Sequence, residues 1–86
     1  MTTWTGRKAR RLRAACLATY GTICHLCGGA GADTADHIIP RSHGGTDDLA
    51  NLRPAHATCN YSRRDMSLDD WHATWRQRRP PSARFR

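Results

Sequence analysis

The sequence predicts a small α+β domain in which a metal-binding loop and two short strands are flanked by helices. Apolar residues recur at helical spacing near both ends of the chain. Between them, two short strand-like segments enclose a polar, glycine-bearing loop, and a pair of metal-ligating residue types stands on either side of these segments. A chain of 86 residues buries too little apolar surface to be comfortably stable alone, so a bound metal ion would act as a staple.

The first part of the chain, residues 1–20, is expected to form a basic amphipathic helix. From about Gly6 to Tyr20, arginines cover most faces, and the remaining face carries four residues at helical spacing, Ala9, Leu12, Cys16 and Thr19. Gly21 is a suitable residue to end this helix.

The central part, residues 21–65, is expected to hold the metal loop and the strands. In chain order we expect a glycine-rich knuckle at 24–31, a short strand at 34–39, a polar loop at 42–48, a second extended piece at 49–53 and a short helix at 57–64. Two short strands would thus flank one loop.

The last part is expected to be a helix over residues 66–79 followed by a basic tail at 80–86. Ser67 suits the N-cap, two aspartates follow in the first turn, and Pro80 and Pro81 end the helix. Its apolar face would be made by Leu68, Trp71 and Trp75. We expect the tryptophans to belong to the core rather than to stack on bases.

Two ligand pairs indicate a structural zinc ion. Cys24-x-x-Cys27 and His56-x-x-Cys59 each have the separation that a tetrahedral zinc ion accepts, and 28 residues lie between the pairs. That gap is too long for an ordinary two-strand finger but long enough to loop out a whole hairpin. His25, between two of the ligands, is expected to be exposed.

Other readings of these residues stay open. Four cysteines could form two disulfides, but no apolar leader follows Met1, so we expect reduced thiols and an intracellular protein. Cys24 and Cys27 could be a redox pair, although no βαβ pattern surrounds them. His56 could be a core histidine, and Cys16 could be a further sulfur ligand instead of a small buried apolar residue.

The charge of the chain favours a polyanionic partner. The net charge is +7, and thirteen of the fourteen basic residues are arginine, whose guanidinium grips phosphate oxygens in pairs. A solvated basic face that only aids solubility is the alternative. The basic residues expected to contact nucleic acid are Arg7, Lys8, Arg10, Arg11, Arg13, Arg41, Arg63, Arg64, Arg76, Arg78 and Arg79.

The central part resembles the HNH endonuclease family. The resemblance runs from Cys24 to about Arg64 and is carried by these pieces in order: Asp36-His37 with Ile-Ile-Pro, Gly44-Gly45-Thr-Asp47-Asp48, Asn51-Leu52, His56-x-x-Cys59-Asn60 and Arg63-Arg64. The chain departs from the family pattern at Asn60, which stands where the final histidine is usual. The resemblance implies a ββα-metal finger, here stapled by zinc, with helices on both sides.

The resemblance also implies roles in phosphodiester hydrolysis. His37 would be the general base, because histidine, with an ordinary pKa of about 6.5, can accept a proton at neutral pH. Asn51 would orient the base through its amide oxygen. Asp36 and Asn60 would hold a catalytic Mg²⁺ or Mn²⁺ ion through oxygen atoms. Neighbouring strand residues point to opposite faces, so Asp36 and His37 must meet a phosphate from different sides or across a bend.

The function expected from these features is metal-dependent nicking or cutting of DNA in the cytoplasm, or in the host cytoplasm if a phage encodes the chain. We expect a monomer or weak dimer with no membrane association. The alternatives are a zinc-stabilised module that only binds nucleic acid, and an accessory of a phage DNA-packaging complex that works with terminase subunits. A binding module would need the zinc ligands but not Asp36, His37 or Asn60.

Overall fold

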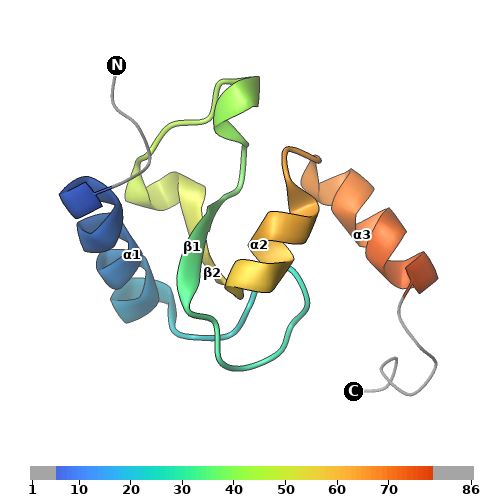
Figure 1. Ribbon diagram of the computed structural model, residues 1–86, viewed down its shortest axis with the longest axis horizontal. Coiled ribbons are helices and arrows are strands. Elements are labelled where there is room, and N and C mark those ends of the chain that lie inside the picture. The colour runs from blue at the N-terminus through green and yellow to red at the C-terminus, as the bar shows by residue number, and fades with distance from the viewer. Residues whose placement is uncertain (1–5, 79–86) are drawn as a thin grey trace.

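The computed structural model describes residues 6–78, and side chains as far as Thr74 (Figure 1). The chain order is α1, β1, two short 3₁₀ turns, β2, α2 and α3. This arrangement confirms the expected α+β class. None of the helices in the described part is long and apolar enough to cross a membrane.

Helix α1 spans Gly6–Tyr20, as the apolar spacing predicts. Ala9 and Cys16 are buried, whereas Thr19, expected on the same face, is exposed. The helix contacts both strands, so its apolar face covers one side of the hairpin. Three of its four arginines, Arg7, Arg10 and Arg11, are exposed.

The sheet is a two-stranded antiparallel hairpin of β1, Thr34–His37, and β2, Leu52–Ala55. The register places Thr34 opposite Ala55 and His37 opposite Leu52. Both expected strands were placed slightly wrongly. The first ends two residues early, at His37, and the second begins only at Leu52, because the segment Leu49–Asn51 forms a 3₁₀ turn.

The loop between the strands folds tightly back on the end of β1. It contains a 3₁₀ turn at Arg41–His43 that Gly44 ends with φ 89°. At Gly45 the backbone N–H donates to the Pro40 carbonyl at 3.0 Å. A Cβ at this position would collide with the Ile39 carbonyl oxygen and stand 2.9 Å from that of Pro40, so only glycine fits.

Two helices follow β2. Helix α2 spans Ala57–Arg63 and helix α3 spans Leu68–Arg78. Ser67 caps α3 as expected, since its hydroxyl accepts the Asp70 backbone N–H at 3.1 Å. Trp71 on α3 is buried, and its indole N–H donates to the Leu26 carbonyl at 3.0 Å, which confirms a core role. Several expected features lie outside the described residues: the side chains of Trp75, Arg76 and Arg78, and all of Arg79 and the tail at 80–86.

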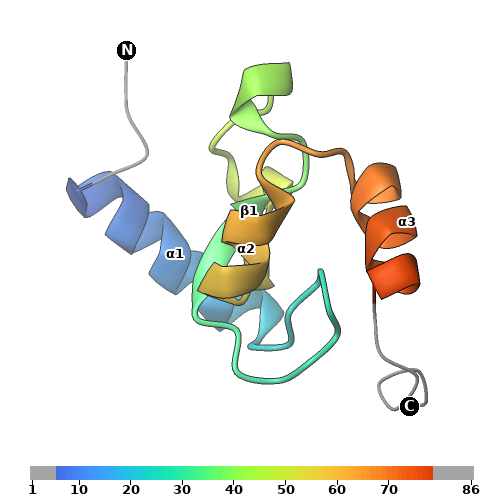
Figure 2. The same cartoon turned by 45° about the vertical axis from the view of Figure 1, so that its right-hand side comes forward.

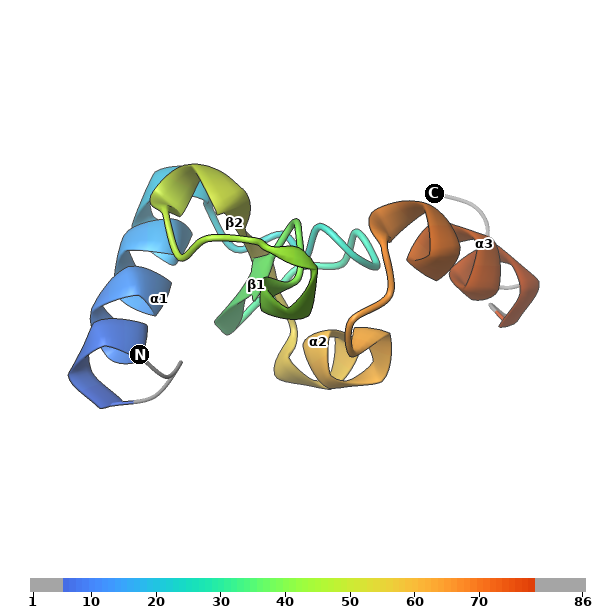
Figure 3. The same ribbon diagram turned by 90° about the horizontal axis from the view of Figure 1, so that it is seen from above.

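The hairpin lies between helices (Figures 1 and 3). Helix α1 lies along one side of it, and α2 and α3 lie on the other. Turning the molecule shows α2 crossing in front of β1, with α3 farther out (Figure 2). The segment before β1 runs below α2 and brings the knuckle near α3, where Leu26 meets Trp71.

The core is small and contains few large apolar side chains. One cluster joins Cys24, Leu26, Ala32, Ala55 and Trp71, and a second joins Cys16, Ala35 and Leu52. The largest fully buried side chain is that of Arg63, which is charged. Such a core supports the expectation that this domain needs a metal staple.

Candidate functional site

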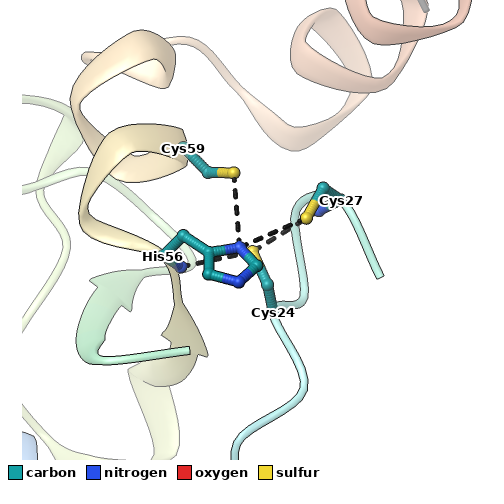
Figure 4. A group of neighbouring side chains, drawn as sticks. All are labelled: Cys24, Cys27, His56 and Cys59. Atoms are coloured by element: carbon teal, nitrogen blue, oxygen red, sulfur yellow. Dashed lines mark hydrogen bonds between the residues drawn. The ribbon is translucent and has the colours of Figure 1, made fainter. Parts of the chain in front are cut away.

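The expected zinc ligands come together at one end of the domain. The ligand atoms of Cys24, Cys27, His56 and Cys59 all lie within 4.8 Å of one another. Figure 4 shows the four side chains pointing toward a common centre, two from the knuckle loop and two from the start of α2. The imidazole Nδ1 of His56 is 3.3 Å from the Cys27 sulfur and 3.7 Å from the Cys59 sulfur. Three sulfurs and one imidazole at this spacing could hold a tetrahedral zinc ion.

Backbone groups around the cluster prepare it for a cation. The other imidazole nitrogen of His56, Nε2, lies 2.8 Å from the Ala30 carbonyl, which fixes the tautomer with the lone pair on Nδ1. Backbone N–H groups of Cys27 and His56 donate to the Cys24 sulfur at 3.5 and 3.4 Å. That of Gly29 donates to the Cys27 sulfur at 3.4 Å.

The thiols have unequal acidities. Burial acts to raise the pKa of Cys24, but hydrogen bonds from backbone N–H groups lower it below the ordinary value. Burial and then the negative charge of Cys24 raise the pKa of Cys59 to about 12. Three thiolates can therefore coexist here only with compensating positive charge, which a divalent ion supplies. Cys16 lies outside this cluster, fully buried in the second core cluster, as its apolar reading predicts.

Asp36 is held from two sides by cationic or donor side chains. Its carboxylate oxygen Oδ2 lies 2.7 Å from His25 Nε2 and 2.5 Å from Arg63 Nη1. Arg63 also donates to three backbone carbonyls, those of His37, Ile38 and Met66. Asp36 is only 4% exposed, so its carboxylate is buried.

Two expectations are corrected by this arrangement. His25 is not exposed, because its ring packs against Asp36 with only 17% of the side chain accessible. Arg63 does not belong among the residues that contact nucleic acid, because it is 0% exposed and its guanidinium is occupied inside the domain. Nothing in the sequence distinguishes Arg63 from its exposed neighbour Arg64, so only the fold could show the difference.

His37, at the end of β1, is paired with a carboxylate that sequence reasoning did not single out. Its Nε2 lies 2.8 Å from Asp47 Oδ1. The other Asp47 oxygen lies 3.1 Å from Lys8 Nζ, and Oδ1 also lies 3.5 Å from Arg41 Nε. Partial burial acts to raise the pKa of Asp47, but hydrogen bonds from His37 and Lys8 hold it below its usual value. Asp47 is therefore an ionised acceptor beside the histidine.

The side chain of Asn51 hydrogen-bonds to the backbone of the loop and not to the ring of His37. Its amide oxygen accepts the Ile39 backbone N–H at 3.0 Å, and its nitrogen donates to the carbonyls of Ile39 and Thr46 at 3.1 and 2.8 Å. These bonds tie the residues just after His37 to the segment just before Asp47. Asn51 thus keeps the two ends of the loop together.

Asn60 lies in α2, one helical turn before Arg63. Residues three apart on a helix share a face, so Asn60 is on the side of α2 that Arg63 turns toward Asp36. It follows Cys59 directly, so a metal ion held by the four-residue cluster would also fix its position.

Seven of the basic residues expected to contact nucleic acid have surface at which they can do so. Arg7, Arg10, Arg11, Arg41 and Arg64 are exposed, and Lys8 and Arg13 are partly buried. Lys8 from α1 and Arg41 from the loop both reach Asp47, so they bring positive charge next to His37.

Comparison with known proteins bears on this geometry. A family model described as HNH endonuclease matches residues 24–65, close to half of the chain. No curated protein and no solved structure matches the chain. The matched segment holds the metal cluster, both strands, the loop and α2. Over residues 24–65 the chain is therefore similar to the HNH endonuclease family.

Proposed function

We propose that this chain is a single-domain, metal-dependent endonuclease that hydrolyses DNA phosphodiester bonds. The observation that carries the proposal is the pairing of His37 with ionised Asp47 at the end of β1, with Lys8 and Arg41 beside it. An oriented base next to cations is what attack of water on a phosphodiester requires.

His37 is the general base in this proposal, and its reacting atom is Nδ1. An ionised carboxylate only accepts hydrogen bonds, so Nε2 carries the hydrogen that meets Asp47 and Nδ1 keeps a lone pair. As the oxygen of water bonds to phosphorus and a phosphoester bond breaks, the proton of the water passes to Nδ1. Asp47 stabilises the imidazolium that forms.

Asp36 and Asn60 are the proposed ligands of a catalytic Mg²⁺ or Mn²⁺ ion. Their oxygen atoms suit a hard cation, one charged and one neutral. Among the described residues, Asp36 Oδ1 receives no hydrogen bond, so this oxygen fits the role. When bound, the ion would supply positive charge that stabilises the departing oxyanion.

A zinc ion held by Cys24, Cys27, His56 and Cys59 has a structural role in this proposal. It fills a closed set of four ligands, as structural zinc sites do, and ties the knuckle to the start of α2. The exposed arginines of α1, with Arg41 and Arg64, grip the DNA backbone through phosphates.

Cleavage of supercoiled plasmid by the zinc-loaded protein tests the proposal. Wild type, His37→Ala and the control His72→Ala are compared at low salt with EDTA, Mg²⁺ or Mn²⁺. Conversion to open-circle or linear DNA by wild type and His72→Ala, only with added metal, is the expected result. If all three proteins retard the plasmid in a gel but none cuts it, the chain is a binding module or an accessory of a DNA-packaging complex instead.

A further inference from the structure

We infer that His25 and Arg63 are positioning residues that together hold one oxygen of Asp36 and so present the other to the catalytic ion. The inference rests on the proposed function, because it concerns the same carboxylate. It adds an assignment for two side chains that the hydrolysis itself does not use.

Both residues act on the same atom. His25 Nε2 lies 2.7 Å and Arg63 Nη1 lies 2.5 Å from Asp36 Oδ2. A carboxylate oxygen has about two lone-pair positions, so two N–H donors occupy those of Oδ2. Asp36 is therefore left to bind an ion through Oδ1 alone. Binding through one carboxylate oxygen suits the near-octahedral coordination of Mg²⁺ and Mn²⁺.

The two donors come from different parts of the fold, and each is itself fixed. Arg63 donates to the carbonyls of His37 and Ile38 at the end of β1 and to that of Met66 just after α2, and these bonds fix its guanidinium. His25 lies in the knuckle, and its backbone N–H donates to the Pro54 carbonyl at 2.9 Å.

The position of His25 links the two proposed metal sites. It stands between the ligands Cys24 and Cys27, so the turn that their metal closes also sets the place of its ring. Side chains that hydrogen-bond to metal ligands usually change affinity by roughly 10- to 100-fold when they are removed. The knuckle thus preorganises Asp36 through one imidazole.

Amide substitutions at position 25 separate a positioning role from a folding role. The side-chain nitrogen of glutamine has about the reach of Nε2, so His25→Gln can still donate to Asp36, whereas the shorter His25→Asn cannot. Arg63 is left unchanged, because its removal would strand a buried charge on Asp36. The zinc content and the thermal midpoint of both variants are measured as the control for folding.

The readout is binding of Mn²⁺ alone to the full-length, zinc-loaded protein, followed by the electron paramagnetic resonance signal of the free ion. Wild type should bind Mn²⁺ through a site that Asp36→Asn abolishes. His25→Asn should weaken that binding by roughly 10-fold or more, and His25→Gln should restore most of it, with zinc content unchanged in both.

Different failures separate the two proposals. If wild type and Asp36→Asn bind Mn²⁺ equally, the proposed catalytic site is wrong, whatever His25 does. Equal Mn²⁺ affinity of wild type and His25→Asn, with an intact Asp36-dependent site, overturns the positioning role alone. Loss of zinc by both position-25 variants would overturn it too, because His25 would then serve the folding of the knuckle.

Discussion

Replacing Asp47 with asparagine should slow cleavage without weakening DNA binding. Asp47 accepts the His37 Nε2 hydrogen at 2.8 Å and carries the charge that would stabilise the imidazolium. The substitution keeps the size of the side chain and an acceptor oxygen but removes that charge. It also offers the ring an amide donor, which favours the wrong tautomer.

The size of the effect follows from this contact. Both side chains are about seven-eighths buried, with exposed fractions of 12% for His37 and 13% for Asp47, so water screens the interaction only weakly. Hydrogen bonds to charged groups contribute about 1.5–3 kcal/mol, which corresponds to about 10- to 150-fold in rate if the contact is needed in the transition state. Because the variant still has an acceptor, we expect the lower part of this range.

The DNA affinity of Asp47→Asn should rise or stay unchanged, although its cleavage rate falls. Lys8 and Arg41 both lie against Asp47, so removing its charge leaves them free to attract phosphate. The matched control is Asp48→Asn, which makes the same change of charge at the next residue. Asp48 is exposed, and its carboxylate accepts the Thr46 hydroxyl at 3.1 Å instead of contacting the histidine.

The assay is single-turnover nicking of a labelled duplex at saturating protein, with DNA affinity measured separately at several salt concentrations. Asp47→Asn should lower the rate constant, whereas Asp48→Asn should leave it near the wild-type value. Equal rate constants for the two variants would show that Asp47 does not orient the base, and the reasoning from the contact would fail.

Three further outcomes are expected from the same structure. Cys59→Ala should lose zinc and unfold by circular dichroism, because binding of structural zinc contributes about 10–16 kcal/mol while the whole free energy of unfolding of a domain is about 5–15 kcal/mol. The control Cys16→Ala should keep its zinc, and a folded, zinc-loaded Cys59→Ala protein would contradict this. Gly45→Ala should lower the thermal midpoint more than Gly21→Ala, since a Cβ at Gly45 meets backbone atoms and one at Gly21, where φ is 90°, meets only open space. The pKa of Asp47 is depressed in the folded protein, so its carboxylate contributes fully to stability above the unfolded pKa of about 3.9, and this contribution is lost as the pH falls through the lower, folded pKa. The free energies of unfolding of wild type and Asp47→Asn, measured by chemical denaturation, should therefore converge below about pH 4.

The sequence was most informative where local physical chemistry decides the structure. The bounds of α1 follow from apolar spacing and Gly21, and the start of α3 follows from the Ser67 cap. The zinc ligands follow from their spacing, because two short-range pairs need only one long-range meeting to form a site.

Contacts between distant elements could not be read in this way. His25 looks like a surface residue in the sequence, and only the packing of the knuckle against β1 turns it toward Asp36. Asp47 is one of two adjacent aspartates, and only the folded loop shows that Asp47 contacts His37 while Asp48 contacts Thr46. The strand ends were also misplaced, since a 3₁₀ turn stands before Leu52 and Asn51 at its end is bonded to Ile39, twelve residues away.

In the proposed active site, Asp36 and His37 are each held by different residues from different parts of the fold. Asp36 is held by His25 from the knuckle and by Arg63 from α2, whereas His37 is held by Asp47, which Lys8 contacts from α1. Neighbouring strand residues point to opposite faces, so a phosphate can meet both groups only across the end of β1, where the strand stops at His37.

Loss of the His25–Asp36 contact and loss of the His37–Asp47 contact should therefore slow cleavage independently. Among the residues that the structure describes, His25 hydrogen-bonds to Asp36 and to none of the groups around Asp47. The rate losses of His25→Asn and Asp47→Asn should therefore multiply in the double variant, within about twofold. Arg63 is different, because the same nitrogen that meets Asp36 also donates to the His37 carbonyl. Single-turnover rates of the two single variants and the double variant measure the coupling. A double variant no slower than Asp47→Asn alone would mean that both residues act through one shared arrangement, and the division of the site across β1 would be wrong.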